Sequence, residues 1–145
     1  MKKTIVAATA LLFSLAAMAG DAGVNEKVLN AFKKDFSSAT QVEWTTGSGF
    51  YKAVFLYNEK YVYAFYSEEG RLLGLTRNIT VSELPLKLQT CLKKNYDQYW
   101  ISDLFEAARE EGTFWYITLE DADTRLVLKA TAEQPWTVYE KQKKA

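Results

Sequence analysis

Three short acidic segments come nearest, among the residues of this sequence, to catalytic or metal-binding chemistry. They are Glu68-Glu69, Glu110-Glu111 and Asp121-Ala122-Asp123. Paired carboxylates can run glycoside hydrolysis or bind Ca²⁺. Each segment has the composition of a turn, where charged side chains are normally solvated, and the third lacks the glycine and distal glutamate of a calcium loop. We therefore expect no catalytic residue, no metal and no cofactor.

The numbers of histidines and cysteines exclude further kinds of catalytic and metal-binding site. The chain contains no histidine, which removes the usual general base, the His-activated nucleophiles and the commonest metal ligand. Cys91 is the only cysteine, so no intramolecular disulfide can form. Its neighbours Leu88 and Leu92 indicate a helix in which the thiol packs as a small apolar group; a reactive or intermolecular thiol is the alternative. The sequence predicts that the protein is not an enzyme.

Aromatic residues at alternating positions indicate recognition rather than catalysis. In the strand expected at residues 50–57, Lys52 is the residue least suited to burial, so Ala53 and Phe55 should face the core. Lys129 and Arg125 orient the second half in the same way. The inward set is then Tyr51, Ala53, Phe55, Tyr57, Val62, Ala64, Tyr66, Trp115, Ile117, Leu119, Leu126 and Leu128.

The outward set is the candidate partner-binding site. It consists of Lys52, Tyr61, Tyr63, Phe65, Phe114 and Tyr116. Tyrosine is enriched at binding hot spots, and a contiguous exposed aromatic patch usually contacts a partner. The alternative is that these rings only pack across strands, and a register error of one residue would invert every assignment.

The N-terminus has the pattern of a secretory signal peptide, residues 1–19. Lys2 and Lys3 precede the apolar run Thr4–Leu15, and Ala17-Met18-Ala19 supplies the small residues of a cleavage site. The run is shorter than the roughly 20 residues of a membrane-spanning helix. We expect a periplasmic or secreted protein with no membrane anchor after cleavage.

The charge balance argues against nucleic-acid binding. The chain has 18 basic and 18 acidic residues, and removal of the leader takes away two lysines. No clustered basic face of the kind that binds DNA or RNA is apparent. Lys141, Lys143 and Lys144 form only a small basic tail, which we expect to be solvated.

Apolar periodicity predicts one helix and about four strands in each half of the chain. Residues 24–36 follow a helical period, and a second helix is expected after Ser82, its predicted N-cap, with Pro85 in the first turn. The expected strands span residues 41–45, 50–57, 61–66, 71–77, 100–107, 113–119, 125–131 and 136–139.

The two halves are similar to each other. Residues 28–36 align with residues 88–96, and Phe50-Tyr51 with Phe114-Trp115. We predict an α+β fold in which two helix-plus-antiparallel-strand repeats, residues 20–80 and 81–145, form one continuous sheet with both helices on one face.

Several segments resemble the beta-lactamase-inhibitor-like, PepSY-like family of small exported bacterial proteins. They are Ala31–Phe36, Val42–Trp44, Tyr51–Phe55, Glu68–Gly74 and Ser82–Pro85. The likeness covers residues 24–96 well and the second half loosely, and it departs at Asn25 and Ser37, where the family often has proline. It implies an exported, non-enzymatic protein built from two helix-plus-sheet repeats, with no catalytic residue to carry over.

The expected function is therefore binding of a protein or peptide through the outer sheet face, as an inhibitor-like protein or envelope accessory. A structural envelope protein whose aromatic residues only pack is the alternative. The identity of the partner and the oligomeric state stay open.

Overall fold

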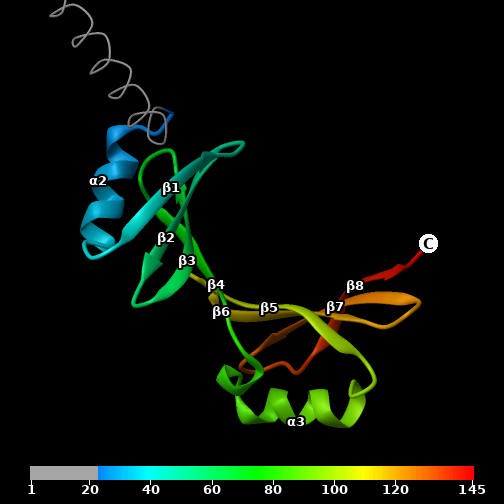
Figure 1. The fold of residues 1–145 in the computed structure, drawn as a ribbon. Helices are drawn as coiled ribbons and strands as arrows, with labels where there is room; N and C mark the ends of the chain where they lie inside the picture. Colours follow the sequence, from blue (N-terminus) through cyan, green and yellow to red (C-terminus); the bar gives the residue numbers. More distant parts are fainter. Residues whose placement is uncertain (1–22) are drawn as a thin grey trace, which may run out of the picture. The chain divides into compact units, whose positions relative to one another are not determined.

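A computed structural model describes residues 23–145; the predicted signal peptide, residues 1–19, lies outside the described residues. Two α-helices and an eight-stranded antiparallel sheet with strand order β1 to β8 make up the described part (Figure 1). The predicted α+β class is confirmed. The elements are α2 (Glu26–Asp35), β1 (Thr40–Thr46), β2 (Phe50–Tyr57), β3 (Lys60–Ser67), β4 (Leu72–Asn78), a 3₁₀ helix (Val81–Glu83), α3 (Leu86–Asn95), β5 (Trp100–Arg109), β6 (Gly112–Glu120), β7 (Thr124–Thr131) and β8 (Thr137–Lys143).

The chain divides into two compact units. The first comprises residues up to Glu59 together with Tyr63–Leu72, and the second comprises Lys60–Val62 and Leu73–Ala145. No helix in residues 23–145 is long and apolar enough to cross a bilayer.

The first unit has an aromatic core under α2. Asn25 caps the helix by accepting a hydrogen bond from the Val28 amide at 3.0 Å. The Phe32 ring meets the rings of Trp44 and Phe55 edge-on, with centroids 5.3 and 4.9 Å away. Edge-to-face packing of this kind is favourable beyond the apolar area that it buries.

The turn between β3 and β4 is attached to the start of α2. Asn25 Nδ2 donates to the Glu68 carbonyl at 2.9 Å. Gly70 has φ +88°, and a Cβ there would lie 2.8 Å from the Lys27 carbonyl oxygen. Only glycine meets both requirements, so this turn fixes the helix against the strands.

The second unit begins its helix later than the sequence predicts, and Ser82 is not the N-cap of α3. The 3₁₀ helix Val81–Glu83 comes first, and the Thr80 amide donates to Glu83 Oε2 at 2.8 Å. Leu84 is extended (φ −74°, ψ 153°) because a residue before proline is driven out of the helical region. Pro85 therefore occupies the N-cap position of α3.

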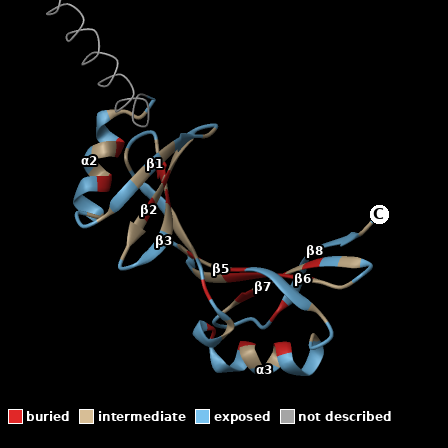
Figure 2. Ribbon diagram, viewed as in Figure 1, coloured by how far each residue is buried: buried red, intermediate tan, exposed pale blue. Residues whose placement is uncertain are grey.

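The core of the second unit is mainly aliphatic. Buried members of it are Leu84, Leu88, Leu92, Leu104, Ile117, Leu119, Leu126 and Leu128, with Trp115 and Trp136. Figure 2 shows the buried residues of α3 on the side that faces the strands. Trp136 Nε1 donates to the Leu88 carbonyl at 3.1 Å, which satisfies a buried polar group. Cys91 is only partly buried against this core.

The predicted alternation of the strands is confirmed at the central inward positions. Tyr51, Tyr57 and Val62, which the sequence predicts to face inward, are only partly buried, and in β6 the whole run Trp115–Leu119 is buried. Ala53, Phe55, Ala64 and Tyr66 are fully buried in the first unit. In the second unit Trp115, Ile117, Leu119, Leu126 and Leu128 are buried. The residues between them in sequence therefore lie on the outer face of each unit.

Candidate functional site

The outer face of the first unit carries a continuous run of apolar side chains, which we call the first outer surface. Its members are Phe50, Lys52, Val54, Leu56, Tyr63 and Phe65, and all six are partly exposed. They alternate with the buried residues of β2 and β3, whose side chains pack under α2. Lys52 is the one charged member.

The rings of the first outer surface are held in place by their neighbours. The Phe50 and Phe65 centroids lie 6.0 Å apart, and Lys52 Nζ lies 5.9 Å from the Tyr63 centroid. The Phe50 ring lies back over Gly47, at a position where any Cβ would clash with it. Tyr61, two residues before Tyr63 on β3, belongs to the second unit and is not a member of this surface; it is 53% exposed, the most accessible aromatic residue of the predicted set.

The outer face of the second unit carries the second outer surface, which is closed by its own side chains. Its members are Phe105, Phe114, Tyr116 and Tyr139, with Arg109 and Lys129. Phe105 stacks on Tyr116 with centroids 5.1 Å apart, and Tyr139 meets Tyr116 edge-on at 5.4 Å. As a result, Tyr116 is only 7% exposed.

Two cations lie over these rings. Lys129 Nζ is 4.9 Å from the Phe114 centroid and 5.8 Å from those of Tyr116 and Tyr139. The Arg109 guanidinium carbon is 5.2 Å from the Phe114 centroid. In residues 23–145 the salt bridges involve other cations, so ring faces are the main electrostatic partners of these two.

The predicted site residues therefore have different surroundings. Lys52, Tyr63 and Phe65 come together in the first outer surface, and Phe114 is partly exposed in the second. The expectation that the Tyr116 ring is exposed is wrong. It points outward as predicted, but Phe105, its direct partner in the β5–β6 register, lies against it.

Sequence reasoning missed Phe105, Arg109 and Tyr139. Tyr139 is the extra residue of a bulge in β8, since Val127 pairs with Glu140 and Leu128 with Val138. A bulge redirects a side chain and leaves no periodic signal in a short strand. The pairing of β5 with β6 could have suggested Phe105, because alternation from Leu104 places it on the outer face.

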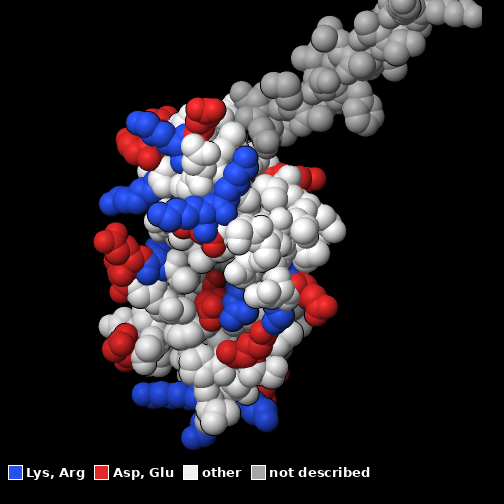
Figure 3. Space-filling view, turned by 90° about the vertical axis from the view of Figure 1, so that its left-hand side faces the viewer, with Lys and Arg blue, Asp and Glu red and all other residues white. Residues whose placement is uncertain are grey.

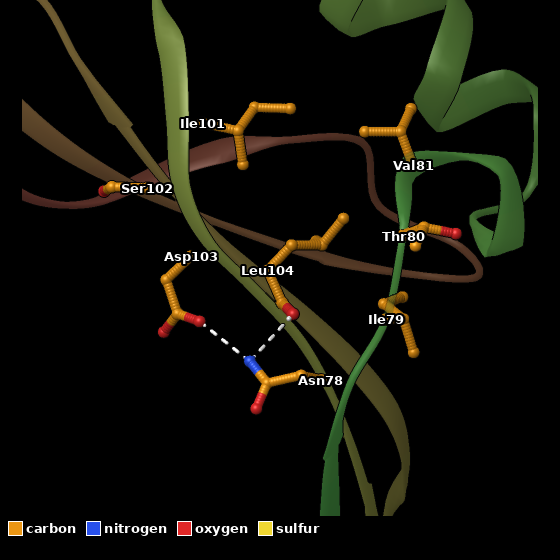
Figure 4. Close-up of a pocket in the computed structure, with 8 residues that line it drawn as sticks. All are labelled: Asn78, Ile79, Thr80, Val81, Ile101, Ser102, Asp103 and Leu104. Carbon is orange, nitrogen blue, oxygen red and sulfur yellow. Dashed lines mark hydrogen bonds between the residues drawn. The ribbon is translucent and has the colours of Figure 1, made fainter. Parts of the chain in front are cut away.

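An open hollow of about 300 Å³ lies where β4 and β5 part (Figure 4). Asn78 Nδ2 donates across it to Asp103 Oδ1 at 2.9 Å and to the Leu104 carbonyl at 3.3 Å. In the described part of the chain no three His, Cys, Asp or Glu side chains group as a metal site would require.

Three ionisable groups of the described residues have shifted pKa values, and each has structural partners. Hydrogen bonds from Ser102 and Lys144 lower the pKa of the Glu120 carboxyl. Burial raises the pKa of the Tyr66 hydroxyl, and its 2.9 Å hydrogen bond to Asp35 acts in the same direction. A hydrogen bond from Lys60 at 2.6 Å, with a second from the Thr80 amide, lowers the pKa of Glu83 to about 2. None of these three groups is a member of either outer surface.

Surface charge is mixed in sign. On the face shown in Figure 3, Lys and Arg side chains are interspersed with Asp and Glu. Such a face lacks the single-sign potential that attracts nucleic acid.

Comparison with known proteins identifies the fold. No family model matches the chain, and no curated protein matches it. A BLIP-like protein from Bacteroides fragilis superposes with a TM-score of 0.71 at 15% identity, over 83% of this chain and 86% of that one. A DUF2874 family protein from Bacteroides uniformis gives 0.73 at 15% identity, over 83% and 89%. A Bacteroides eggerthii protein with a periplasmic description gives 0.73 at 14%, over 83% and 88%. At the level of the fold, the resemblance predicted from the sequence is confirmed.

Proposed function

We propose that this chain, which shares the fold of BLIP-like and DUF2874 proteins, is an exported, non-enzymatic protein that binds a protein or peptide. The observation that carries the proposal is the first outer surface. It presents five apolar side chains and one lysine, all partly accessible to solvent, on the face opposite the α2 core. Contiguous accessible apolar surface of this kind usually marks an interaction site.

The physical case rests on residue type and rigidity. Tyrosine and phenylalanine provide a large contact area at a low cost in side-chain entropy. The contacts of Phe50 with Phe65, and of Lys52 with Tyr63, already restrict these side chains before binding. Inhibition by occlusion, or a role as an envelope accessory, would both use such a surface.

Export and the repeat organisation belong to the same proposal. The leader Met1–Ala19 would direct the chain to the periplasm or out of the cell. The repeats at residues 20–80 and 81–145 are supported by two parallels between the halves. Both α-helices have ten residues and end with a C-cap aromatic residue, Phe36 or Tyr96, whose amide bonds back to residue 32 or 92. Both β1 and β5 have a bulge near their start.

The proposal is tested by removing two partly exposed rings of the first outer surface and measuring whether a partner protein is still bound. Tyr63→Ala/Phe65→Ala should reduce recovery of a specific protein from periplasmic extract at least tenfold, since hot-spot rings of this type contribute 2 kcal/mol or more. The control is Leu86→Ser, because Leu86 is 78% exposed on α3 and lies outside both outer surfaces. Equal recovery by the folded double variant and the control would reject the first outer surface as the binding site.

A structural envelope protein is the second candidate, and the second outer surface favours it. Tyr116 is buried among its own neighbours, which is the behaviour of a packing residue. Under this alternative Tyr63→Ala/Phe65→Ala would lower the free energy of unfolding, measured with urea, without changing any binding. Recovery of the partner by the folded variant therefore separates the two candidates.

A further inference from the structure

Strand β8 leaves one edge of the sheet open. It is the last strand in the sheet order and pairs with β7 on one side. All seven of its residues, Thr137–Lys143, are exposed, and no other described strand pairs with its far side. An open edge presents unpaired backbone N–H and C=O groups, which can accept another strand.

The register shows which backbone groups face this open edge. The Lys144 amide donates to the Asp123 carbonyl at 2.8 Å, and Lys143 is paired with Thr124. In an antiparallel pair, hydrogen-bonded and non-hydrogen-bonded residues alternate. The amides and carbonyls of Lys143 and Lys141 therefore point away from β7, toward the open edge.

The side chains of the edge are basic and apolar. Residues 137–144 contain three lysines and one glutamate. Lys144 is engaged with Glu120 at 3.1 Å, whereas Lys141 and Lys143 take part in none of the salt bridges among the described residues. Their cross-strand partners Leu126 and Thr124 lie on one face, so the two ammonium groups share a side of the edge.

Lysines on an edge strand commonly prevent association with other strands. This explains why a second copy is a poor occupant, because two β8 edges would bring lysines together. It does not explain the exposure of Val138 and Tyr139, which stay 59% and 60% exposed on the same strand although Tyr139 also contacts Tyr116. A purely protective edge would not expose two large apolar side chains.

We propose that β8 is a strand-addition edge for an extended acidic peptide segment of another protein. The segment would pair with the outward backbone groups of Lys141 and Lys143, as in other cases of β-augmentation. Alternate carboxylates would meet the two ammonium groups, and the apolar residues between them would lie on the opposite face of the strand, beside Tyr139. This site is the edge of the sheet rather than its face, so it is independent of the first outer surface.

The probes are three synthetic eight-residue peptides measured by fluorescence anisotropy at low salt. The first alternates glutamate and valine, the second alternates lysine and valine, and the third is the acidic peptide with alternate amides N-methylated. We expect the acidic peptide to bind at least tenfold more tightly than either of the others. The positive charge of Lys141 and Lys143 favours a negatively charged peptide, and N-methylation removes the N–H donors that backbone pairing needs.

The protein variants assign the site. Lys141→Glu/Lys143→Glu should weaken binding of the acidic peptide at least tenfold, and Lys141→Gln/Lys143→Gln should weaken it by less. The matched control is Lys33→Glu/Lys34→Glu, an exposed lysine pair in the last turn of α2. Because all these side chains are exposed, folding should be retained, and circular dichroism would check it.

Two results would overturn the proposal. Equal binding of the N-methylated peptide would mean that the lysines act as a charged tail without strand pairing. Equal weakening by the α2 control would mean attraction to overall charge. Tyr63→Ala/Phe65→Ala should leave binding of the acidic peptide unchanged, so failure of this proposal and failure of the proposed function can be distinguished.

Discussion

The two units cover their strands with one helix each but fill the core with different side chains. In the first unit Phe32, Phe36 and Phe55 contact one another, with centroids 4.9 to 5.6 Å apart. In the second unit α3 packs through Leu88 and Leu92 onto leucine and isoleucine. Similar local patterns of apolar residues can therefore support aromatic or aliphatic packing, because a helical stripe specifies burial rather than shape.

The outer surfaces differ more than the cores. One cation lies near one ring in the first outer surface, whereas Lys129 alone lies over three rings in the second. Tyr116 is consequently buried, while Tyr63 stays partly accessible. The difference shows that a strand's outward residues become a binding surface only when neighbouring strands leave them uncovered.

The largest effect should come from the aromatic core. Phe55→Ala should lower the free energy of unfolding by about 3–5 kcal/mol, because it removes a ring that Phe32 and Phe36 both contact. Leu128→Ala, fully buried in the second unit, should lose about 2–5 kcal/mol. Urea unfolding measures both. A loss below about 1 kcal/mol for Phe55→Ala would mean that its site collapses around the smaller side chain.

Tyr66→Phe should lower the free energy of unfolding by less than Phe55→Ala does, and it should change how that free energy depends on pH above pH 8. Loss of the hydrogen bond to Asp35 should lower the free energy of unfolding by about 1–2 kcal/mol. The folded pKa of Tyr66 is raised, so its contribution is complete below the unfolded pKa of about 10 and is lost as pH rises through the folded pKa. Stability measured from pH 8 to 11 should therefore fall less in the variant than in the parent.

Removal of a predicted helix cap should lower the free energy of unfolding in the first unit by about 1 kcal/mol more than in the second. Asn25→Ala removes the N-cap of α2 and should cost about 1 kcal/mol or somewhat more, since Asn25 also bonds Glu68. Ser82→Ala should stay within about 0.5 kcal/mol, because Ser82 does not cap α3. Thermal unfolding gives both values, and a larger loss for Ser82→Ala would contradict the observed start of α3.

Replacing the lysines should test whether contacts between cations and rings stabilise the second outer surface more than the first. Lys129→Met should lower stability by about 0.5–1 kcal/mol, since three ring faces lose their cation. Lys52→Met, with one contact at 5.9 Å, should be close to neutral. Near-ultraviolet circular dichroism should change for Lys129→Met only. Equal effects would mean that the cations do not distinguish the two surfaces.

The smallest effect should be the acid dependence of Glu83→Gln. The folded pKa of Glu83 is about 2, so its contribution is present above the unfolded pKa of about 4.3 and is lost as pH falls toward 2. Thermal unfolding from pH 5 to 2 should show a shallower fall in the variant. An unchanged slope would show that the hydrogen bond from Lys60 does not persist in solution.

Much of the fold could be predicted because the lysines in a strand show which of its side chains face solvent, and therefore which alternate side chains face the core. Lys52 and Lys129 identify the outward residues, so Phe55, Tyr66 and Leu128 are correctly placed inside. The start of α3 could not be read from Ser82, because Pro85 restricts Leu84. The extension of β8 to Lys143 was also missed, since its glutamate, lysines and glutamine have low strand propensity.

The sequence predicts toward which face the side chains of the candidate site point, but not how far each side chain is exposed to solvent. Alternation places Tyr63 and Tyr116 on outer faces, yet one ring is accessible and the other buried. The decisive neighbours of Tyr116 are Phe105 and Tyr139, which come from two other strands. Their positions depend on register and on a bulge.

The sequence by itself determined which catalytic side chains the chain lacks and which residues of most strands face the core. The lack of histidine and the single cysteine are facts of composition, and the inward residues follow from a period of two. Tertiary structure decided which outward residues stay accessible and which strand ends the sheet with its basic edge unpaired. Both depend on cross-strand neighbours that lie far apart in the chain, so no local pattern of residues encodes them.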